Sequence, residues 1–371
     1  MRIFLMFVTL FLGLKGFAVD VRDSFQLDGV FRNYIVHLPT SYTTSKNYAL
    51  VFNLHGYTSN ADQQLLYSSM NSTADANEFI VVYPNGIANY WNAFGQGEND
   101  VKFIDSLIEK LSRSYTIDKN CVYSCGMSNG GFMSYTLACQ LSHKIAAVAS
   151  VTGVLSNHTI NNCTLSHPVP VMQIHGTADP TVNYTTGTAN GVGVEQTVNF
   201  WLGKNNCTSM SDTIDVPNTN TTDGCTAELI RYQQCDAGSN VYFYKIDGGA
   251  HTWPGAPLTI GVTNRDFNAN IEIWNFFKRF KLNQLVGITQ TLEDLKVEVF
   301  PIPSTQYLTL KFSEVDNRNI IIYNTLGQEV YSINTNTSTQ EFNTSGWSKG
   351  LYYLNVTDSK GAKFSTSFLK D

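Results

Sequence analysis

Charged side chains are scarce in this sequence. Lys, Arg, Asp and Glu make up 15% of its 371 residues, against about 25% in an average soluble protein. The 24 basic residues, set against 30 acidic ones, form no run or stripe that could neutralise a row of phosphates. The composition therefore argues against a nucleic-acid partner, and it is common in exported proteins that handle neutral molecules.

Metal-binding patterns are missing as well. The cysteines lie at positions 121, 125, 139, 163, 207, 225 and 235, without a Cys-x-x-Cys pair or a Cys/His cluster of metal-ligand spacing. We therefore expect no metal site. An odd number of cysteines cannot pair completely within one chain. Cys121 and Cys125 lie four apart in a predicted strand, on one face but too far apart to bond to each other, so we expect two buried thiols there.

Long apolar runs are confined to the N-terminus. Arg2 precedes an apolar stretch over residues 3–14, and small residues follow at Gly16 and Ala18, which is the pattern of a secretory signal peptide over residues 1–18. The stretch is too short to span a membrane, and no later segment reaches about 18 apolar residues. An uncleaved anchor is the alternative. We expect a mature protein without a membrane span, secreted to the extracellular space or the cell surface.

Aromatic residues, in contrast, are plentiful: 22 Phe and 19 Tyr supply material for a sizeable core. Nearly continuous apolar runs, typical of strands buried in a parallel sheet, alternate with segments of helical periodicity. The runs cover residues 48–54, 79–83, 121–125, 146–151, 170–174 and 241–246. Over residues 19–283 this alternation predicts an α/β fold with a mostly parallel sheet flanked by helices.

The pattern changes near residue 284. Residues 284–294 are polar and weakly periodic, and we interpret them as a linker. Residues 295–371 contain short alternating runs separated by turn signals. The runs lie at residues 308–312, 320–323, 329–333 and 351–356. Closely spaced short strands without helical periodicity predict a small C-terminal β-sandwich.

One segment matches a pattern for nucleophilic chemistry. Gly126-Met-Ser128-Asn-Gly130 fits the G-x-S-x-G nucleophile elbow. Alone the match is weak, because an ordinary glycine-rich turn can produce it. The context strengthens it, since the segment follows the run ending at Cys125 and opens a helical stretch over residues 131–141. This order places the Ser128 hydroxyl above the sheet at a helix N-terminus and predicts an α/β-hydrolase nucleophile.

A serine nucleophile needs a base, and the base needs an acid to hold it. In this arrangement the chain order is Ser, acid, His, with each residue in a loop after a strand. Asp179 follows the run ending at residue 174, and His251 is the only histidine that follows a later strand. We therefore predict a catalytic triad of Ser128, Asp179 and His251 at the carboxyl ends of strands.

The tetrahedral intermediate of such a reaction also needs hydrogen-bond donors for its oxyanion. The predicted donors are the backbone N–H groups of Asn129, directly after the nucleophile, and of Tyr57, in the loop after an early strand. We interpret His55 as a structural residue that braces this loop. Trp91 and Trp253 are predicted substrate contacts.

Five segments carry a resemblance to a known family. They are Leu54-His-Gly56, Tyr83-Pro-Asn-Gly86, Gly126-Met-Ser-Asn-Gly-Gly131, His175-Gly-Thr-Ala-Asp179 and Gly248-Gly-Ala-His-Thr-Trp-Pro-Gly255. The region from Asp28 to Phe280 resembles the polyhydroxybutyrate depolymerase-like esterases, secreted α/β-hydrolases that include feruloyl and acetylxylan esterases. The resemblance implies the same triad and no metal or organic cofactor. It also implies the disulfides Cys139–Cys163 and Cys207–Cys235, with the other cysteines as departures.

The C-terminal region has a resemblance of its own. Phe300-Pro-Ile-Pro303, Ile322-Tyr-Asn-Thr-Leu-Gly327, Gly350-Leu-Tyr-Tyr-Leu-Asn-Val356 and Phe368-Leu-Lys-Asp371 are similar to a type IX secretion sorting domain. Ile302 stands where that pattern usually has Asn. The resemblance implies recognition by the type IX export machinery. An accessory β-domain that binds substrate is the alternative.

Together these features predict a secreted serine carboxylesterase that forms an acyl-enzyme. Its expected substrate is a polyester or an ester of a plant cell-wall polysaccharide. A serine peptidase with the same triad is one alternative, and activity on short esters without amide cleavage would separate the two. The other alternative is a non-catalytic surface adhesin or glycan-binding protein, which a complete lack of ester turnover would favour.

Overall fold

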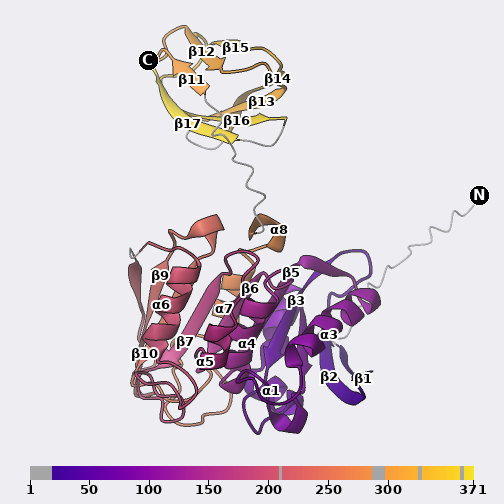
Figure 1. The fold of residues 1–371 in the computed structure, drawn as a ribbon. Helices are drawn as coiled ribbons and strands as arrows, with labels where there is room; N and C mark the ends of the chain where they lie inside the picture. Colours follow the sequence, from indigo (N-terminus) through magenta and orange to yellow (C-terminus); the bar gives the residue numbers. More distant parts are fainter. Residues whose placement is uncertain (1–18, 209–210, 286–296, 325–327, 360–362) are drawn as a thin grey trace, which may run out of the picture. The chain divides into compact units, whose positions relative to one another are not determined.

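The computed structural model describes residues 19–208, 211–285, 297–324, 328–359 and 363–371 (Figure 1). They fall into two compact units, one within residues 1–287 and the other within residues 288–371. The signal peptide predicted at residues 1–18 and most of the linker predicted at residues 284–294 lie outside the described residues.

The first unit is built on one large mixed sheet. In order of neighbours, its described strands are β1 (Val19–Leu27), β2 (Val30–Leu38), β4 (Ile80–Pro84), β3 (Tyr48–Leu54), β5 (Ile117–Met127), β6 (Ala147–Val151), β7 (Val171–Gly176), β10 (Val241–Asp247), β9 (Thr226–Tyr232) and β8 (Asp212–Val216). The strands from β4 to β10 in this order are parallel, whereas β1–β2 and β9–β8 pair antiparallel at the two edges. This confirms the predicted mostly parallel sheet.

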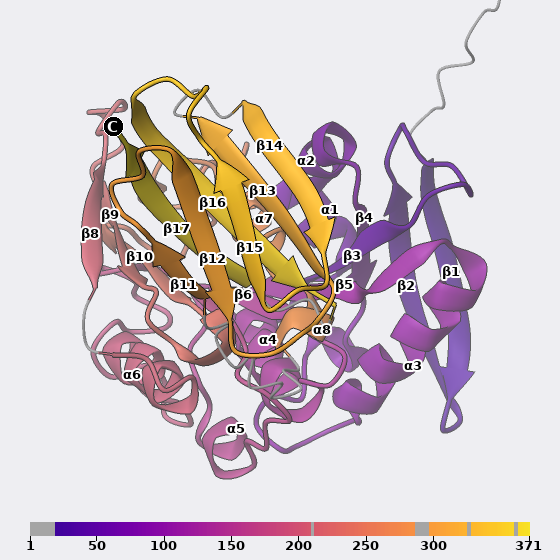
Figure 2. The same ribbon diagram turned by 90° about the horizontal axis from the view of Figure 1, so that it is seen from above.

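Helices cover both faces of this sheet (Figures 1 and 2). One face packs against α3 (Asp100–Ser114), α4 (Asn129–Gln140) and α6 (Val194–Lys204), and the other against α1 (Ala61–Ser68), α2 (Met70–Asn77) and α7 (Ala269–Phe277). The short elements are α5 (Asn157–Asn161), α8 (Leu282–Leu285), η1 (Ile87–Asn89) and η2 (Asp236–Gly238). Among the described helices, none has the length and apolarity needed to cross a membrane.

The central strands supply two cores, because successive side chains of a strand point to opposite faces of the sheet. Along β3, Leu50 and Phe52 join the core under α3 and α4, while Val51 joins the core under α2 and α7. Burying each such side chain contributes about 1.5–3 kcal/mol. The need for apolar residues on both faces explains why this strand appears in the sequence as an uninterrupted apolar run.

Periodicity in the sequence does not reveal every element. Strand β8 is almost entirely exposed, and the side chains that α1 buries belong to Ala61, Gln64 and Ser68. Neither segment presents an apolar pattern of its own. Their structure depends on tertiary contacts, which override local propensity.

The second unit consists of two antiparallel sheets. The first contains β11 (Val297–Phe300), β12 (Tyr307–Phe312) and β15 (Thr339–Asn343), and the second contains β14 (Glu329–Thr335), β13 (Arg318–Asn324), β16 (Gly350–Asp358) and β17 (Lys363–Lys370). Leu308 and Phe342 from one sheet share a core with Ile320 and Leu354 from the other. Two sheets around a common core confirm the predicted β-sandwich.

Candidate active site

Four parallel strands deliver the candidate residues to one edge of the sheet. Strand β3 ends before the loop of His55 to Tyr57, β5 ends at Met127, β7 ends at Gly176, and β10 ends at Asp247. Ser128 follows β5 directly, whereas Asp179 and His251 lie a few residues beyond the ends of β7 and β10. Open α/β sheets bind their ligands at this carboxyl edge.

Ser128 occupies a sharp turn between β5 and α4. Its φ of 54° and ψ of −119° are costly for a residue with a side chain, and its N–H donates to the Val151 carbonyl oxygen at 2.8 Å. The turn needs glycine on both sides, because a Cβ on Gly126 would lie 2.5 Å from the Gly130 carbonyl carbon, and one on Gly130 would lie 2.2 Å from the Leu54 carbonyl oxygen. The strained turn therefore holds the serine at the start of a helix.

Asp179 and His251 form a hydrogen bond. His251 Nδ1 lies 2.7 Å from Asp179 Oδ2, and the carboxylate side chain is fully buried while the imidazole is 17% exposed. An ionised carboxylate only accepts hydrogen bonds, so Nδ1 carries the proton and Nε2 is left as an acceptor. His251 can therefore take a proton at Nε2, where Ser128 lines the same cavity.

A second buried histidine also contacts the acid. His175 Nε2 lies 3.4 Å from Asp179 Oδ2 and 2.9 Å from the Val182 carbonyl oxygen. Burial alone would raise the pKa of Asp179, but the hydrogen bonds with His175 and His251 outweigh it and hold that pKa below its ordinary value. The N–H groups of Thr181 and Val182 add two hydrogen bonds of 2.8 Å to Oδ1. The carboxylate thus stays ionised despite its burial.

The sequence alone assigns no role to His175, which stands there only as the first residue of the segment that ends at Asp179. Its spacing of four residues before Asp179 could have pointed to the contact, but a turn of unknown geometry separates the two positions. Only the fold shows that the end of β7 turns back and brings them together.

The loop after β3 lies against the nucleophile. A Cβ built on Gly56 would be 3.6 Å from the Ser128 Cβ, so the backbone of this loop passes directly beside the serine. His55 braces the loop as expected, since its Nδ1 donates to the Gly56 carbonyl oxygen at 2.8 Å and its Nε2 accepts from the Gly86 N–H at 3.0 Å. Tyr57 follows, with its side chain 64% exposed.

The two predicted tryptophan contacts need correction. Trp91 and Trp253 are fully buried and line neither of the cavities at Ser128. The Trp91 indole donates to the His55 carbonyl oxygen at 2.9 Å, and its backbone exchanges two hydrogen bonds with the Asn129 side chain. Trp91 therefore ties the two predicted oxyanion segments to each other. Trp253 supports the His251 loop from the core and donates to Asn270.

Two cavities meet at Ser128 and Tyr57. The larger, about 790 Å³, is lined by four aromatic residues and by part of α5; the smaller, about 390 Å³, contains His251. In the larger cavity Tyr90 lies 5.9 Å from the Tyr57 ring and 6.4 Å from the Phe94 ring, and Phe94 lies 5.0 Å from the Phe132 ring, between centroids. The larger cavity is therefore suited to a flat apolar group.

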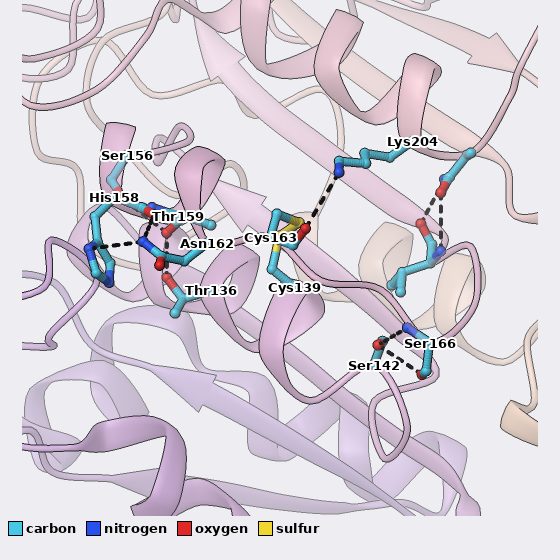
Figure 3. Close-up of a disulfide and its surroundings, with 12 residues drawn as sticks. Thr136, Cys139, Ser142, Ser156, His158, Thr159, Asn162, Cys163, Ser166 and Lys204 are labelled. Carbon is cyan, nitrogen blue, oxygen red and sulfur yellow. Dashed lines mark hydrogen bonds between the residues drawn. A yellow bond between two sulfur atoms is a disulfide. The ribbon is translucent and has the colours of Figure 1, made fainter.

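A disulfide anchors one wall of the larger cavity (Figure 3). It joins Cys139 of α4 to Cys163, just beyond α5, whose His158 lines the cavity. The hydroxyls of Thr136 and Thr159, 2.8 Å apart, form a second link between the same two helices. The structure also forms Cys207–Cys235, and it leaves Cys121, Cys125 and Cys225 as buried thiols.

Two other acidic residues near the candidate triad, Asp247 and Asp266, make different hydrogen bonds. Asp247 accepts a hydrogen bond from the Thr177 hydroxyl at 3.1 Å, and Asp266 accepts from the N–H groups of Thr219 and Asn220 at 2.8 Å. Among the described residues, neither is hydrogen-bonded to His251, whose carboxylate partner is Asp179. In that part of the chain, no cluster of His, Cys, Asp and Glu has the makings of a metal site.

Comparison with known proteins defines the class. A family model described as phospholipase/carboxylesterase matches residues 92–214, and a secretion system C-terminal sorting domain matches residues 298–370. With the mostly parallel sheet and its helices, these matches define a carboxylic ester hydrolase of the α/β-hydrolase fold. The sorting domain marks it as a secreted or cell-surface protein and replaces the accessory-domain alternative.

Individual relatives narrow this class to a family. A probable feruloyl esterase C of Aspergillus terreus is 31% identical over 245 residues, covering 62% of this chain and 79% of the relative. The chain therefore belongs to the same family of esterases as this relative. A bifunctional acetylxylan esterase/xylanase of Neocallimastix patriciarum is 26% identical over 264 residues, or 71% of this chain, which spans only 35% of that relative. A solved acetyl xylan esterase of Aspergillus awamori is 17% identical with a TM-score of 0.47, over 64% of this chain and 94% of the other.

Proposed function

We propose that the chain is a serine esterase in which Ser128 is the nucleophile, His251 the general base and Asp179 the acid that orients it. The observation that carries the proposal is the 2.7 Å contact between His251 Nδ1 and the buried Asp179, beside a cavity that His251 shares with the strained Ser128. This combination of a nucleophile, a base and a buried acid is what acyl transfer through a serine requires.

The proposed reaction has two steps. The Ser128 oxygen forms a bond to the ester carbonyl carbon and gives its proton to His251 Nε2; the carbon–oxygen bond to the alcohol then breaks, and His251 returns the proton to the leaving oxygen. Water repeats the sequence on the acyl-enzyme, releases the acid and restores the serine. Asp179 keeps the imidazole in the required tautomer and stabilises its charged form.

The proposed oxyanion donors are the backbone N–H groups of Tyr57 and Asn129. Two observations support them: the loop of Gly56 passes beside Ser128, and Asn129 begins α4, where the helix dipole favours negative charge. Trp91 hydrogen-bonds to the Asn129 side chain and to the His55 carbonyl oxygen, and so links the two segments. These hydrogen bonds support the backbone on both sides of the strained Ser128.

We further propose that the acyl group occupies the larger cavity. His251, which returns a proton to the leaving alcohol, lines only the smaller cavity, so the alcohol must depart on that side. The aromatic rings of the larger cavity then face the acyl group and favour a phenylpropenoyl acid such as ferulate, the acid named for the Aspergillus terreus relative. A 3-hydroxybutyrate polyester is the second candidate, on the resemblance of the sequence segments alone.

For the C-terminal unit we propose export by the type IX machinery, with residues 19–283 as the esterase domain and residues 295–371 as the sorting domain. The sorting-domain match over residues 298–370 supports the assignment. The Asn-x-Ser/Thr sequences of the chain, such as those at Asn157 and Asn183, then reflect its composition and are not glycosylation sites.

The test of the triad is replacement of the nucleophile. Ser128→Ala should lower kcat on methyl ferulate by at least about 10⁴-fold, because the attacking oxygen is gone and only the oxyanion donors and binding remain. A fluorophosphonate probe should label the wild type and fail to label the variant. Ser114→Ala, at the exposed end of α3, is the control and should behave as the wild type. Turnover by Ser128→Ala near the wild-type rate would refute the mechanism.

A further inference from the structure

The smaller cavity has a rim of exposed apolar side chains. Leu66, at the end of α1, is 65% exposed, and Leu258 and Ile260, in the loop after His251, are each 57% exposed. Leu66 is far in the sequence from Leu258 and Ile260, and all three line the cavity that contains His251. Single exposed apolar residues are ordinary, but a group gathered around one cavity indicates a binding surface.

Charge is absent from the lining of this cavity among the described residues, His251 apart. Two of its polar groups already bond to the protein: the Gln64 amide donates to Asn53 Oδ1 at 2.8 Å, and the Tyr67 hydroxyl accepts from the Trp253 N–H at 3.0 Å. Besides Ser128 and His251, this leaves Tyr57, Ser59 and Gln63 as the polar side chains that a bound group could meet, fewer than the hydroxyls of a sugar residue in a polysaccharide would need. A sugar needs several partners for its hydroxyls, because each hydroxyl taken from water without a partner is costly. The cavity therefore suits an apolar group better than a saccharide.

We propose that the smaller cavity is the binding site of the alcohol half of the ester, and that it selects alkyl or aryl alcohols over sugars. The assignment rests on the proposed function, since it uses His251 as the group that protonates the departing oxygen. Leu66, Leu258 and Ile260 are then the residues that determine alcohol specificity. The preferred leaving group is then an alkyl or aryl alcohol and not the sugar that a polysaccharide ester would release.

Because the reaction passes through an acyl-enzyme, selectivity for the alcohol can be measured separately from selectivity for the acid. Two esters of one acid lose different alcohols when the Ser128–acyl bond forms, but they give the same acyl-enzyme, which water hydrolyses at the same rate. A preference for one alcohol must therefore appear in kcat/KM, which contains acylation, and not in the rate of deacylation. A preference located in the larger cavity would follow the acid instead.

The experiment compares hexyl ferulate with feruloyl arabinose, and hexyl butyrate with glycerol monobutyrate. The wild type should hydrolyse each hexyl ester with at least a tenfold higher kcat/KM than its polar partner. The double variant Leu258→Asn, Ile260→Asn should lose about tenfold on the hexyl esters, near the lower end of the range for apolar contacts, and change less than twofold on the polar esters. Leu66→Gln should act in the same direction.

Phe31→Thr is the matched control, since Phe31 is 71% exposed and lines neither cavity at Ser128. It should leave every ratio unchanged, and thermal unfolding should show that all variants remain folded. A wild-type preference for the sugar ester, or an equal loss on both esters of a pair, overturns the proposal. If Ser128→Ala remains active, the proposed function itself fails. If Ser128→Ala is inactive and the alcohol ratio is flat, only the alcohol site fails.

Discussion

Asp179 belongs to a buried chain of hydrogen bonds that extends beyond the proposed triad. The Tyr135 hydroxyl donates to Gln173 Oε1, which fixes the amide so that its Nε2 donates to His175 Nδ1 at 3.0 Å. His175 must then carry its proton on Nε2, toward Val182 and Asp179. Each member orients the next, so the position of the carboxylate depends in part on residues that line neither cavity at Ser128.

Replacing the acid tests this residue assignment. Asp179→Asn should lower kcat by about 10⁴-fold, because an amide favours the wrong tautomer of His251. Asp247→Asn, which removes an exposed charge but keeps an oxygen that can accept from the Thr177 hydroxyl, is the control and should change kcat less than threefold. The comparison uses steady-state kinetics on one soluble ester. Equal losses in the two variants would mean that the acid is misassigned.

His55 should make the stability of the protein depend on pH. Burial lowers the pKa of His55 to about 4, against the hydrogen bond to the Gly56 carbonyl, which favours the protonated form. The unfolded chain has a value near 6.5 and binds a proton that the folded chain excludes. The stabilisation from neutral His55 is therefore complete above about pH 6.5 and is lost as the pH falls toward 4.

Denaturant unfolding at pH 7 and pH 4.5 measures this effect. The wild type should lose about 2 kcal/mol more of its free energy of unfolding over that interval than His55→Gln, which cannot take up the proton. Glutamine retains one donor and one acceptor, so the variant is expected to fold. Parallel losses in the two proteins would remove His55 as the cause.

Sequence reasoning reaches single residues only where a motif and a strand coincide. Ser128, Asp179 and His251 each follow an apolar run, which is why they could be proposed from the sequence, and their catalytic roles stay a prediction. The prediction that Trp91 contacts substrate is wrong, since the residue is fully buried. In the sequence, an aromatic residue near glycines looks the same whether it faces substrate or the core. Burial depends on how distant segments meet, and no local pattern records it.

At the scale of elements, α4 and α5 form the wall of the larger cavity. Only five residues long, α5 cannot be stable by itself, since isolated helices of this length are not formed in water. Its position depends on Cys139–Cys163 and on the hydroxyl contact between Thr136 and Thr159 (Figure 3). The shape of this wall of the larger cavity therefore depends in part on one covalent link.

Removing that link should affect stability and binding together. Cys139→Ala with Cys163→Ala should cost about 3 kcal/mol of unfolding free energy for a loop of this size, and should raise KM for methyl ferulate severalfold as α5 loosens. Chemical denaturation and steady-state kinetics measure the two effects.

The second disulfide provides the control for this prediction. The Cys207–Cys235 disulfide closes a loop of similar length, and neither cysteine lines a cavity at Ser128, so Cys207→Ala with Cys235→Ala should lose comparable stability without the change in KM. An identical KM in both double variants would show that α5 is held without the disulfide.

Strands inside the sheet are easier to predict from the sequence than strands at its edge. The apolar runs at 48–54 and 241–246 coincide closely with β3 and β10, because a strand buried on both faces must be apolar throughout. The β8–β9 edge escaped prediction because one side of it faces water and its residues are mixed. The pattern of apolar residues in a strand depends on how much of the strand is buried, and an edge strand, with one neighbour fewer, is less covered.

At the scale of the whole molecule, the two units have separate cores. A chain that ends at Gly287 retains both cores of the hydrolase unit, including the buried Leu285 of α8. It should fold and hydrolyse methyl ferulate with kcat/KM within about tenfold of the full chain. In a host with type IX machinery the same truncation should leave the enzyme in the periplasm, as measured by activity in cell fractions.

The contrary results are equally specific. Loss of folding in the shortened chain would mean that the units depend on each other, and normal export would mean that the C-terminal unit does not direct it. Retained export combined with lost activity on insoluble polymer alone would restore the accessory role for the β-sandwich.

The link between Cys139 and Cys163 also has a consequence for when the enzyme matures. Thiols are kept reduced in the cytoplasm and become disulfides only in oxidising compartments. A newly made chain therefore lacks the bond that fixes α5, and the wall of its larger cavity is completed after the chain has left the cell interior. The larger cavity should therefore bind its ester severalfold more tightly once the chain has left the cytoplasm than before the disulfide forms.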